Sequence, residues 1–325
     1  MVSHLMTDHW PVEVDEILCG DQAVALAHRT PARGVVLTPV TNFALRDRKA
    51  GIVTLNSSIG MWRKLARIRQ DPQVAVAFHT REHGFSDRPE YVLAQGKASL
   101  SSLADRDAWL DSMGESWERF GGQPRDVGRL WDRWLRAYHW RVNIEVAVER
   151  MLVWPDLACR GEPDVYGTAL PAKPSEPQQP PARGTGPRVK HPRAAKKAAR
   201  LPNVLLAWVG ADGFPVVVSV EIVGTETRGI LLETAAAVVP PGGRRAGLTA
   251  HWFSRHVVGQ RQRKYTGWLE AEQAATRVIY APHTERGYSL PSWRWAYNLG
   301  AGFATRRGYR EARRAGFTPP EGVLS

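Results

Sequence analysis

A pattern of strands and turns occurs twice along this chain, and the repeat restricts the possible folds more than any other feature. Residues 204–209 and 216–220 are apolar runs joined by a turn with Asp-Gly, a strong β-hairpin signal. Residues 22–29 and 35–40 form an equivalent pair near the N-terminus. Later segments also match: 229–234 with 51–56, 250–253 with 76–79, 265–270 with 91–98, and 277–282 with 149–155. The sequence therefore predicts two similar β units, offset by roughly 180 residues.

Residues 51–80 are predicted to form a strand, a short helix and a second strand. Residues 52–55 are rich in β-branched and aliphatic side chains, and the hydroxyl and amide residues that follow are typical of a helix cap. An apolar side chain then recurs every three residues, at Ile59, Trp62, Leu65 and Ile68. An Asp-Pro pair ends this helix, because the residue before proline is driven out of the helical region, and residues 74–78 alternate as a strand.

The start of that helix has the chemistry of an anion site. Free backbone N–H groups and the positive end of the helix dipole favour an anion there. Thr54, Ser57 and Ser58 precede the helix, and Arg63 and Lys64 follow within reach. These residues suit a phosphate monoester, although a capped amphipathic helix with a solvated basic face would show the same residues.

The run Arg63-Lys64, six residues, Asp71-Pro72 and then the apolar strand 74–78 resembles the pyridoxamine 5′-phosphate oxidase-like family of flavin-binding split β-barrels. In that family a lysine and hydroxyl groups hold the phosphate of FMN. The candidate phosphate-binding residues that the resemblance implies are Thr54, Asn56, Ser57, Ser58, Arg63 and Lys64.

The resemblance also implies a fold class. We expect a mainly β (α+β) chain of two tandem split β-barrels, each with about six antiparallel strands and a few helices. Because barrels of this family pair as dimers, the tandem chain is expected to be an intramolecular pseudo-dimer. The expected domains are residues 1–158 with the cofactor site, a Pro/Gly-rich basic linker at 159–200, and a degenerate second barrel with a C-terminal lid segment at 201–325.

Further cofactor-binding candidates follow from the resemblance by position. Arg33 and Thr38 stand at the two ends of the second strand, which family members use to contact the cofactor. Gln95 lies on a later strand that would run beneath the cofactor. Trp293 and Arg294 begin an aromatic, basic tail that could close over the ring, although a docked amphipathic helix is the better explanation of the tail.

The second copy lacks the phosphate signature. Where the first copy has its capped helix, the second has alanines followed by Pro240-Pro241, which preclude a helix, and no lysine. Arg244 and Arg245 follow in what reads as a Gly-rich loop. We therefore expect one cofactor site, in the first barrel, with the second barrel as its structural partner.

Composition limits the partners. The formal net charge of +12 favours anionic ligands such as phosphate cofactors. Two cysteines form neither a metal motif nor a disulfide framework, the N-terminus has no signal-peptide pattern, and no segment approaches the about 20 apolar residues needed to span a bilayer. We expect a cytoplasmic protein without a membrane partner, as a monomeric pseudo-dimer or a homodimer, and without a metal site.

Four functions remain open at this point. The first is an FMN-dependent oxidoreductase acting on a small organic substrate, with hydride chemistry supplied by the cofactor and no catalytic side chain identified. The second is a reductase that uses an 8-hydroxy-5-deazaflavin coenzyme. The third is a haem-binding split barrel with His79, His251 or His256 as ligand. The fourth is a nucleic-acid module, against which the absence of a known binding motif argues.

Overall fold

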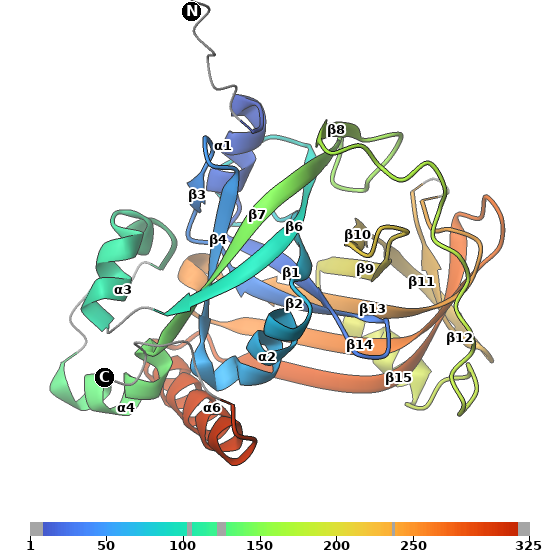
Figure 1. Cartoon of the computed structure of the whole chain (residues 1–325). Helices are drawn as coiled ribbons and strands as arrows, with labels where there is room; N and C mark the ends of the chain where they lie inside the picture. The colour runs from blue at the N-terminus through green and yellow to red at the C-terminus, as the bar shows by residue number, and fades with distance from the viewer. Residues whose placement is uncertain (1–8, 103–105, 122–127, 236–237, 318–325) are drawn as a thin grey trace, which may run out of the picture.

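Two curled antiparallel sheets form most of the molecule (Figure 1). The computed structural model describes residues 9–102, 106–121, 128–235 and 238–317 of the 325. The strands of the first sheet are β1 (Ala23–Arg29), β2 (Val35–Thr41), β3 (Leu45–Asp47), β4 (Ile52–Ser58), β5 (Gln73–Phe78), β6 (Tyr91–Ser102), β7 (Arg141–Trp154) and β8 (Asp164–Gly167). They run in the order β2-β1-β5-β6-β7-β4-β3, and β8 pairs with β7 outside this path.

The second sheet repeats that order strand by strand. Its strands are β9 (Asn203–Val209), β10 (Pro215–Ser219), β11 (Glu221–Glu226), β12 (Gly229–Glu233), β13 (Gly242–Phe253), β14 (Gln260–Ala271) and β15 (Arg277–Leu290). The order β10-β9-β13-β14-β15-β12-β11 follows the first sheet with each strand replaced by its repeat. The predicted mainly β fold of two tandem split barrels is confirmed, with seven strands in the repeated order where about six were predicted. The short strand β3 lies in a charged stretch without a clear apolar pattern.

A shared irregularity shows how closely the two copies match. The pairing of β6 with β7 shifts register beside Gly96, and the pairing of β14 with β15 shifts beside Gly267. A Cβ atom on Gly96 would lie 2.1 Å from the carbonyl oxygen of Ala147, and one on Gly267 would lie 2.1 Å from that of Ala281. Each bulge thus requires glycine for the same close backbone approach.

The barrels share one apolar core. Ala25, Ala27 and Leu37 of the first barrel belong to the same buried cluster as Leu206 and Leu248 of the second. Polar groups also cross the interface. Tyr91 Oη donates to the Val217 carbonyl at 2.8 Å, Gln95 Nε2 donates to the Pro215 carbonyl at 2.7 Å, and Arg150 pairs with Asp212. The two halves of the chain therefore form one body with a continuous interior.

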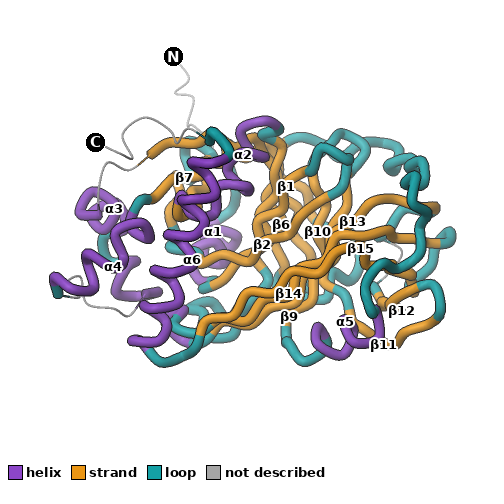
Figure 2. Tube along the Cα trace, turned by 90° about the horizontal axis from the view of Figure 1, so that it is seen from below, coloured by secondary structure: helices purple, strands orange, loops and turns teal. Residues whose placement is uncertain are grey.

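Most helices gather at one end of the strands (Figure 2). They are α1 (Val12–Gly20), η1 (Ile59–Met61), α2 (Trp62–Gln70), α3 (Arg106–Met113), the π-helical turn η2 (Trp117–Gly121), α4 (Arg129–His139), α5 (His191–Ala198), η3 (Arg255–Val257) and α6 (Arg294–Arg314). Helix α5 lies apart from α3, α4 and α6, against the second barrel, where three of its alanines are buried. No helix in the described part of the chain is long and apolar enough to cross a membrane.

Candidate active site

A cavity of about 150 Å³ lies between the barrels, and both contribute its walls. The first barrel supplies strand β2, the end of β4, Lys64 of α2, Tyr138 of α4 and Arg141 of β7. The second supplies one face of β14, Tyr288 of β15, and two residues of α6. The residues that line the cavity include Thr38, Asn56, Ser57, Ser58, Lys64, Trp117, Tyr138, Arg141, Phe253, Gln260, Gln262, Lys264, Tyr288, Tyr297 and Thr305.

The end of β4 presents buried polar side chains to this cavity. Ser58 caps η1 by accepting a hydrogen bond from the Gly60 N–H at 3.2 Å, and its own hydroxyl donates to the Ala137 carbonyl at 3.0 Å. The side-chain Oδ1 of Asn56 accepts a hydrogen bond from the Trp109 indole N–H at 2.8 Å. Among the described residues, the Ser57 hydroxyl makes only a long hydrogen bond, of 3.3 Å, to the carbonyl of the next residue. The Ser57 hydroxyl is therefore the least committed of these groups and the most available to a ligand.

Three cations face the cavity, and none has an acidic partner within the described residues. Lys64 is 8% exposed, and burial, with the nearby charges of Lys264 and Arg141, lowers its pKa to about 7. Burial, with the charge of Arg286, lowers the pKa of Lys264 to about 8. Arg141 is 7% exposed. Like charges held together in a poorly solvated space disfavour one another, and an anion placed among them relieves that cost.

Aromatic rings hold Arg141 in place. Its guanidinium carbon lies 4.3 Å from the centre of the Trp109 ring and 4.1 Å from that of Tyr138. These are cation–π distances, and the Arg141 Nε has no hydrogen-bond partner in the described structure. Ring stacking thus fixes the guanidinium while leaving N–H donors free for a ligand.

The second barrel contributes polar and aromatic wall. Gln262 Nε2 donates to the Pro39 carbonyl on β2 at 3.2 Å, which ties the two walls together. Tyr288 lies directly opposite Gln262 in the β14–β15 pairing. Together with Trp117, Tyr138 and Phe253, these side chains give the cavity flat apolar surfaces beside its cations. Such a combination suits a ligand that carries both an anionic group and a planar ring.

Five predicted site residues line this one cavity. They are Thr38, Asn56, Ser57, Ser58 and Lys64. The helix around Lys64 also forms as expected, since α2 follows η1 directly and buries Lys64, Leu65 and Ile68. Because the apolar side chains Leu65 and Ile68 face the core, Lys64, next to Leu65, is also directed inward.

The other six predicted residues lie elsewhere. Arg63 points away from the cavity and pairs with Glu311 at 3.2 Å. Thr54 pairs with Leu45 in the β3–β4 register, before the strand reaches the cavity. Arg33 occupies a turn with φ of 57°, where its carbonyl accepts a hydrogen bond from Gln178.

The remaining three are Gln95, Trp293 and Arg294. Gln95 is fully buried in the barrel interface, where it bonds to Pro215 and Arg150. Trp293 is 70% exposed at the start of α6, and Arg294 follows it. The wall of the cavity instead takes Tyr297 and Thr305 from further along this helix.

Sequence reasoning missed Arg141 and the contribution of strand β14 of the second barrel. Gln260, Gln262 and Lys264 alternate along β14, and this period of two places all three on the face that meets the cavity. Polar side chains at every second position of a predicted inner strand were the available signal. The second barrel is therefore part of the cavity wall as well as a structural partner.

The basic residues Arg244 and Arg245 of the second barrel have a structural environment of their own. The prediction of a Gly-rich loop around Arg244 and Arg245 was wrong, because both lie in strand β13. Arg244 is 1% exposed and donates to the carbonyls of Ser175, Pro240 and Pro241. The Arg244 guanidinium is thus engaged by backbone oxygens of the preceding loop and of the segment that connects the barrels.

The histidines considered for haem lie away from the cavity lining. His79 and His251 are buried and hydrogen-bonded to each other through their Nε2 atoms at 2.7 Å. His256 belongs to η3 and has φ of 59°. Across the described residues, no group of three or more His, Cys, Asp or Glu side chains could hold a metal ion.

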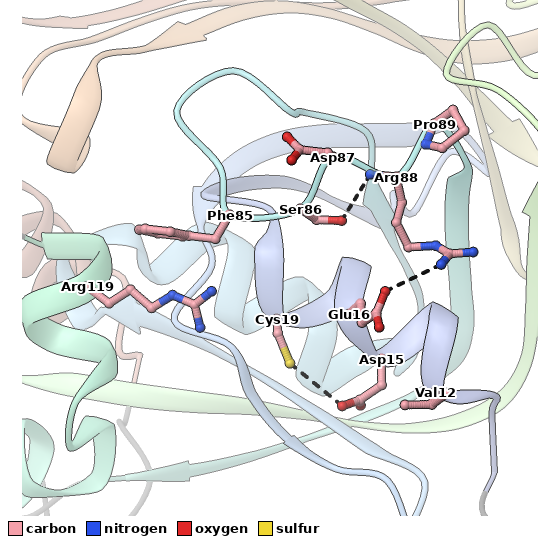
Figure 3. A pocket seen from close by; sticks show the side chains of 10 residues that line it. All are labelled: Val12, Asp15, Glu16, Cys19, Phe85, Ser86, Asp87, Arg88, Pro89 and Arg119. Carbon is pink, nitrogen blue, oxygen red and sulfur yellow. Dashed lines mark hydrogen bonds and ion pairs between the residues drawn. The ribbon is translucent and has the colours of Figure 1, made fainter.

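A second, more open cavity of about 690 Å³ lies beside α1 (Figure 3). Its charged groups are largely paired with one another or with neighbours. Glu16 pairs with Arg88 at 3.4 Å, and Asp15 pairs with Arg46 at 2.6 Å and accepts from Cys19. Arg119 lies over the Phe85 ring at 4.2 Å. Arg88 of this cavity is thus paired with an acid, whereas no described acid pairs with Lys64, Lys264 or Arg141 between the barrels.

No protein-family model and no curated protein matches this sequence. Several solved structures resemble about half of the chain. A conserved hypothetical protein from Mycobacterium tuberculosis is 19% identical, with 48% of this chain and 90% of that chain covered and a TM-score of 0.34. A Clostridium acetobutylicum protein related to general stress protein 26, of the pyridoxinephosphate oxidase family, is 11% identical. That match covers 48% of this chain and 92% of the other, also with a TM-score of 0.34.

A third solved structure is a pyridoxamine 5′-phosphate oxidase-related, FMN-binding protein from Nostoc punctiforme. It is 12% identical, with 41% of this chain and 74% of that chain covered and a TM-score of 0.28. Each of these proteins thus resembles about one half of the duplicated chain. Similarity at this level does not by itself indicate what the chain binds.

Proposed function

We propose that this chain is a flavin-binding oxidoreductase that holds FMN in the cavity between its barrels. One observation carries the proposal: Lys64, Arg141 and Lys264 converge on one cavity without an acidic partner in the described structure. A phosphate monoester carries close to two negative charges near neutral pH and matches such a cluster. The aromatic side chains around the cations offer surfaces for the ring of the cofactor.

The proposed roles follow from position. Lys64, Arg141 and Lys264 would hold the phosphate, and the Ser57 hydroxyl would add a neutral hydrogen bond. The flavin would supply hydride or electron transfer to or from a small organic substrate. The residues of this chain would bind and orient the cofactor, and burial of the cavity would exclude water from it.

The resemblance of residues 63–78 to the flavin-binding family and the flavin-binding description of the Nostoc protein point in the same direction. The absorption spectrum and mass of the small molecule that copurifies with the full chain test the proposal. The expected result is a flavin spectrum with the mass of FMN. A deazaflavin spectrum would assign the cavity to the 8-hydroxy-5-deazaflavin coenzyme instead of FMN. A Soret band from haem would contradict the proposal.

A further inference from the structure

Apart from Arg141, which the rings of Trp109 and Tyr138 hold, the cations at and beside the cavity form two layers. The inner pair is Lys64 and Lys264, which line the cavity itself. The outer pair is Arg67 and Arg286, neither of which lines it. Each pair takes one residue from helix α2 of the first barrel and one from the hairpin β14–β15 of the second. The outer pair thus repeats the construction of the inner one.

Backbone geometry places the outer pair directly beside the inner pair. Arg67 follows Lys64 by three residues on α2, so the two side chains are neighbours about 4.5 Å apart along the helix axis. Arg286 lies directly opposite Lys264 in the β14–β15 register, as Tyr288 lies opposite Gln262. Residues directly opposite in an antiparallel pair project from the same face of the sheet. Arg286 is therefore the next position on the face that lines the cavity.

Electrostatic coupling places the four charges near one another. The charge of Arg286 lowers the pKa of both Lys264 and Arg67, in each case after the larger effect of burial. The charge of Lys264 in turn lowers the pKa of Lys64. A like-charged pair directly opposite in a sheet is destabilising. Like charges are therefore neighbours both on helix α2 and across the β14–β15 pair, where they lower the stability of the folded chain.

No acid among the described residues offsets the four charges. Two acids close to these elements, one on β15 and one on the adjoining helix α6, engage other side chains. Glu285 pairs with Lys197 at 2.7 Å, and Glu311 pairs with Arg63 and Arg307, each at 3.2 Å. Lys197, Arg63 and Arg307, which lie outside the two layers, are thus paired with acids, while the two layers have no acidic partner among the described residues.

His28 adds an unsatisfied polar group to the same region. It is 1% exposed, and neither ring nitrogen has a hydrogen-bond partner in the described structure. Burial, followed by the charges of Arg67, Lys64 and Lys264, lowers its pKa to about 3. The ring is therefore a neutral hydrogen-bonding group held beside both layers.

We propose that Arg67 and Arg286 form a second anionic subsite, so that the cavity takes a ligand with two neighbouring anionic groups. The first group lies between Lys64 and Lys264, and the second lies one step outward between the arginines. A diphosphate or a chain of carboxylates has the required chemistry. FMN alone, with one phosphate, fills only the inner layer. The inference rests on the proposed function for the identity of the inner site and extends it to the remainder of the ligand.

Calorimetric titration of the full chain with orthophosphate, pyrophosphate, acetate and citrate at low salt tests this subsite. We expect pyrophosphate to bind at least about tenfold more tightly than orthophosphate, because a second charge-assisted contact is added. Arg67→Gln and Arg286→Gln should each remove most of that difference and leave orthophosphate binding within about twofold. Both arginines are partly or fully exposed, so the variants are expected to fold, which thermal unfolding verifies.

Arg63→Gln is the matched control, since Arg63 lies on the same helix and pairs with Glu311 outside the cavity. A preference for citrate over acetate with the same dependence on Arg67 and Arg286, without a preference for pyrophosphate, would assign the subsite to carboxylates. Equal binding of mono- and polyanions, or equal effects of Arg63→Gln and Arg67→Gln, would overturn the inference. Titration with FMN separates the two proposals. FMN binding without a preference for polyanions would overturn only the second subsite. A preference for polyanions without FMN binding would overturn only the assignment of FMN to the inner site.

Discussion

The Nε2 atoms of His79 and His251 lie 2.7 Å apart, although the residues are 172 positions apart in the sequence. They occupy equivalent places in the two copies, just after β5 and within β13. His79 Nδ1 lies 3.0 Å from the Ala77 carbonyl and donates to it, so His79 Nε2 accepts a hydrogen bond from the Nε2–H of His251. The Nδ1 atom of His251, an acceptor in this tautomer, has no hydrogen-bond partner in the described structure. Two equivalent residues thus take different tautomers where the barrels meet.

Replacing either histidine should weaken the barrel interface. His79→Leu leaves the His251 N–H without an acceptor, which costs about 1–3 kcal/mol of the free energy of unfolding. The double variant His79→Leu/His251→Leu should lose less than the sum of the single variants, because both partners of the bond are then absent. Denaturant unfolding of the three variants measures this coupling, and additive losses would show that the bond contributes nothing.

The same pair predicts a loss of stability in acid. Burial lowers the pKa of His79 to about 4 and that of His251 well below its usual value. The unfolded chain therefore binds protons below about pH 6.5 that the folded chain refuses, and stability falls as the pH drops from about 6.5 toward 4. The double leucine variant should show a shallower fall. His28, whose pKa is also lowered, keeps some of the dependence in both proteins.

Gly308 sets the distance between α6 and the first barrel. A Cβ atom there would lie 1.9 Å from the Gly60 carbonyl oxygen, and the α6 residues Tyr297 and Thr305 form part of the cavity wall. Gly308→Ala should displace the helix, lower the free energy of unfolding by about 1–3 kcal/mol and weaken FMN binding. Helix propensity alone would make this change stabilising by up to about 1 kcal/mol. A more stable variant with unchanged binding would therefore contradict the role of this contact.

FMN affinity should decrease above neutral pH. The free protein holds Lys64 with a pKa of about 7 and Lys264 with a pKa of about 8, and a bound phosphate favours their charged forms. Binding above pH 7 must then take up protons, so the dissociation constant should rise between about pH 7 and 9, by up to about tenfold per unit for each proton. Fluorescence titrations across this range measure the effect. Riboflavin, which lacks the phosphate, is the control and should show a flat profile.

The sequence predicted the local elements well where a period was strong. Apolar spacing placed the helix that carries Lys64, and the duplicated hairpins predicted two sheets of the same order. Prediction failed where tertiary contacts decide. The arginines after Pro240-Pro241 belong to strand β13 because they pair with β14, and carbonyls of the folded loop and of Ser175 accept hydrogen bonds from the buried Arg244. Nothing in the local pattern predicts these partners.

The cavity shows the same limit. The side of it that is contiguous in sequence, residues 56–64, was predicted. The opposite side is brought in by pairing of the barrels, which places Lys264 near Lys64 from 200 residues further along the chain. Arg141 was missed because its role depends on two rings, of Trp109 and Tyr138, that fix it in space. Residues of this kind become visible only when the interface is known.

Parallel titration of the protein with FMN and riboflavin, before and after the substitution Lys64→Met, tests the central claim most directly. Lys64 contributes through charge, so the wild-type chain should bind FMN much more tightly than riboflavin. The variant should lose about tenfold to a hundredfold in FMN affinity, equivalent to about 1.5–3 kcal/mol, and keep its riboflavin affinity. Arg63→Met, on the exposed side of the same helix, should change neither. Equal binding of the two flavins by the wild-type chain, or undiminished FMN affinity in folded Lys64→Met protein, would contradict the account.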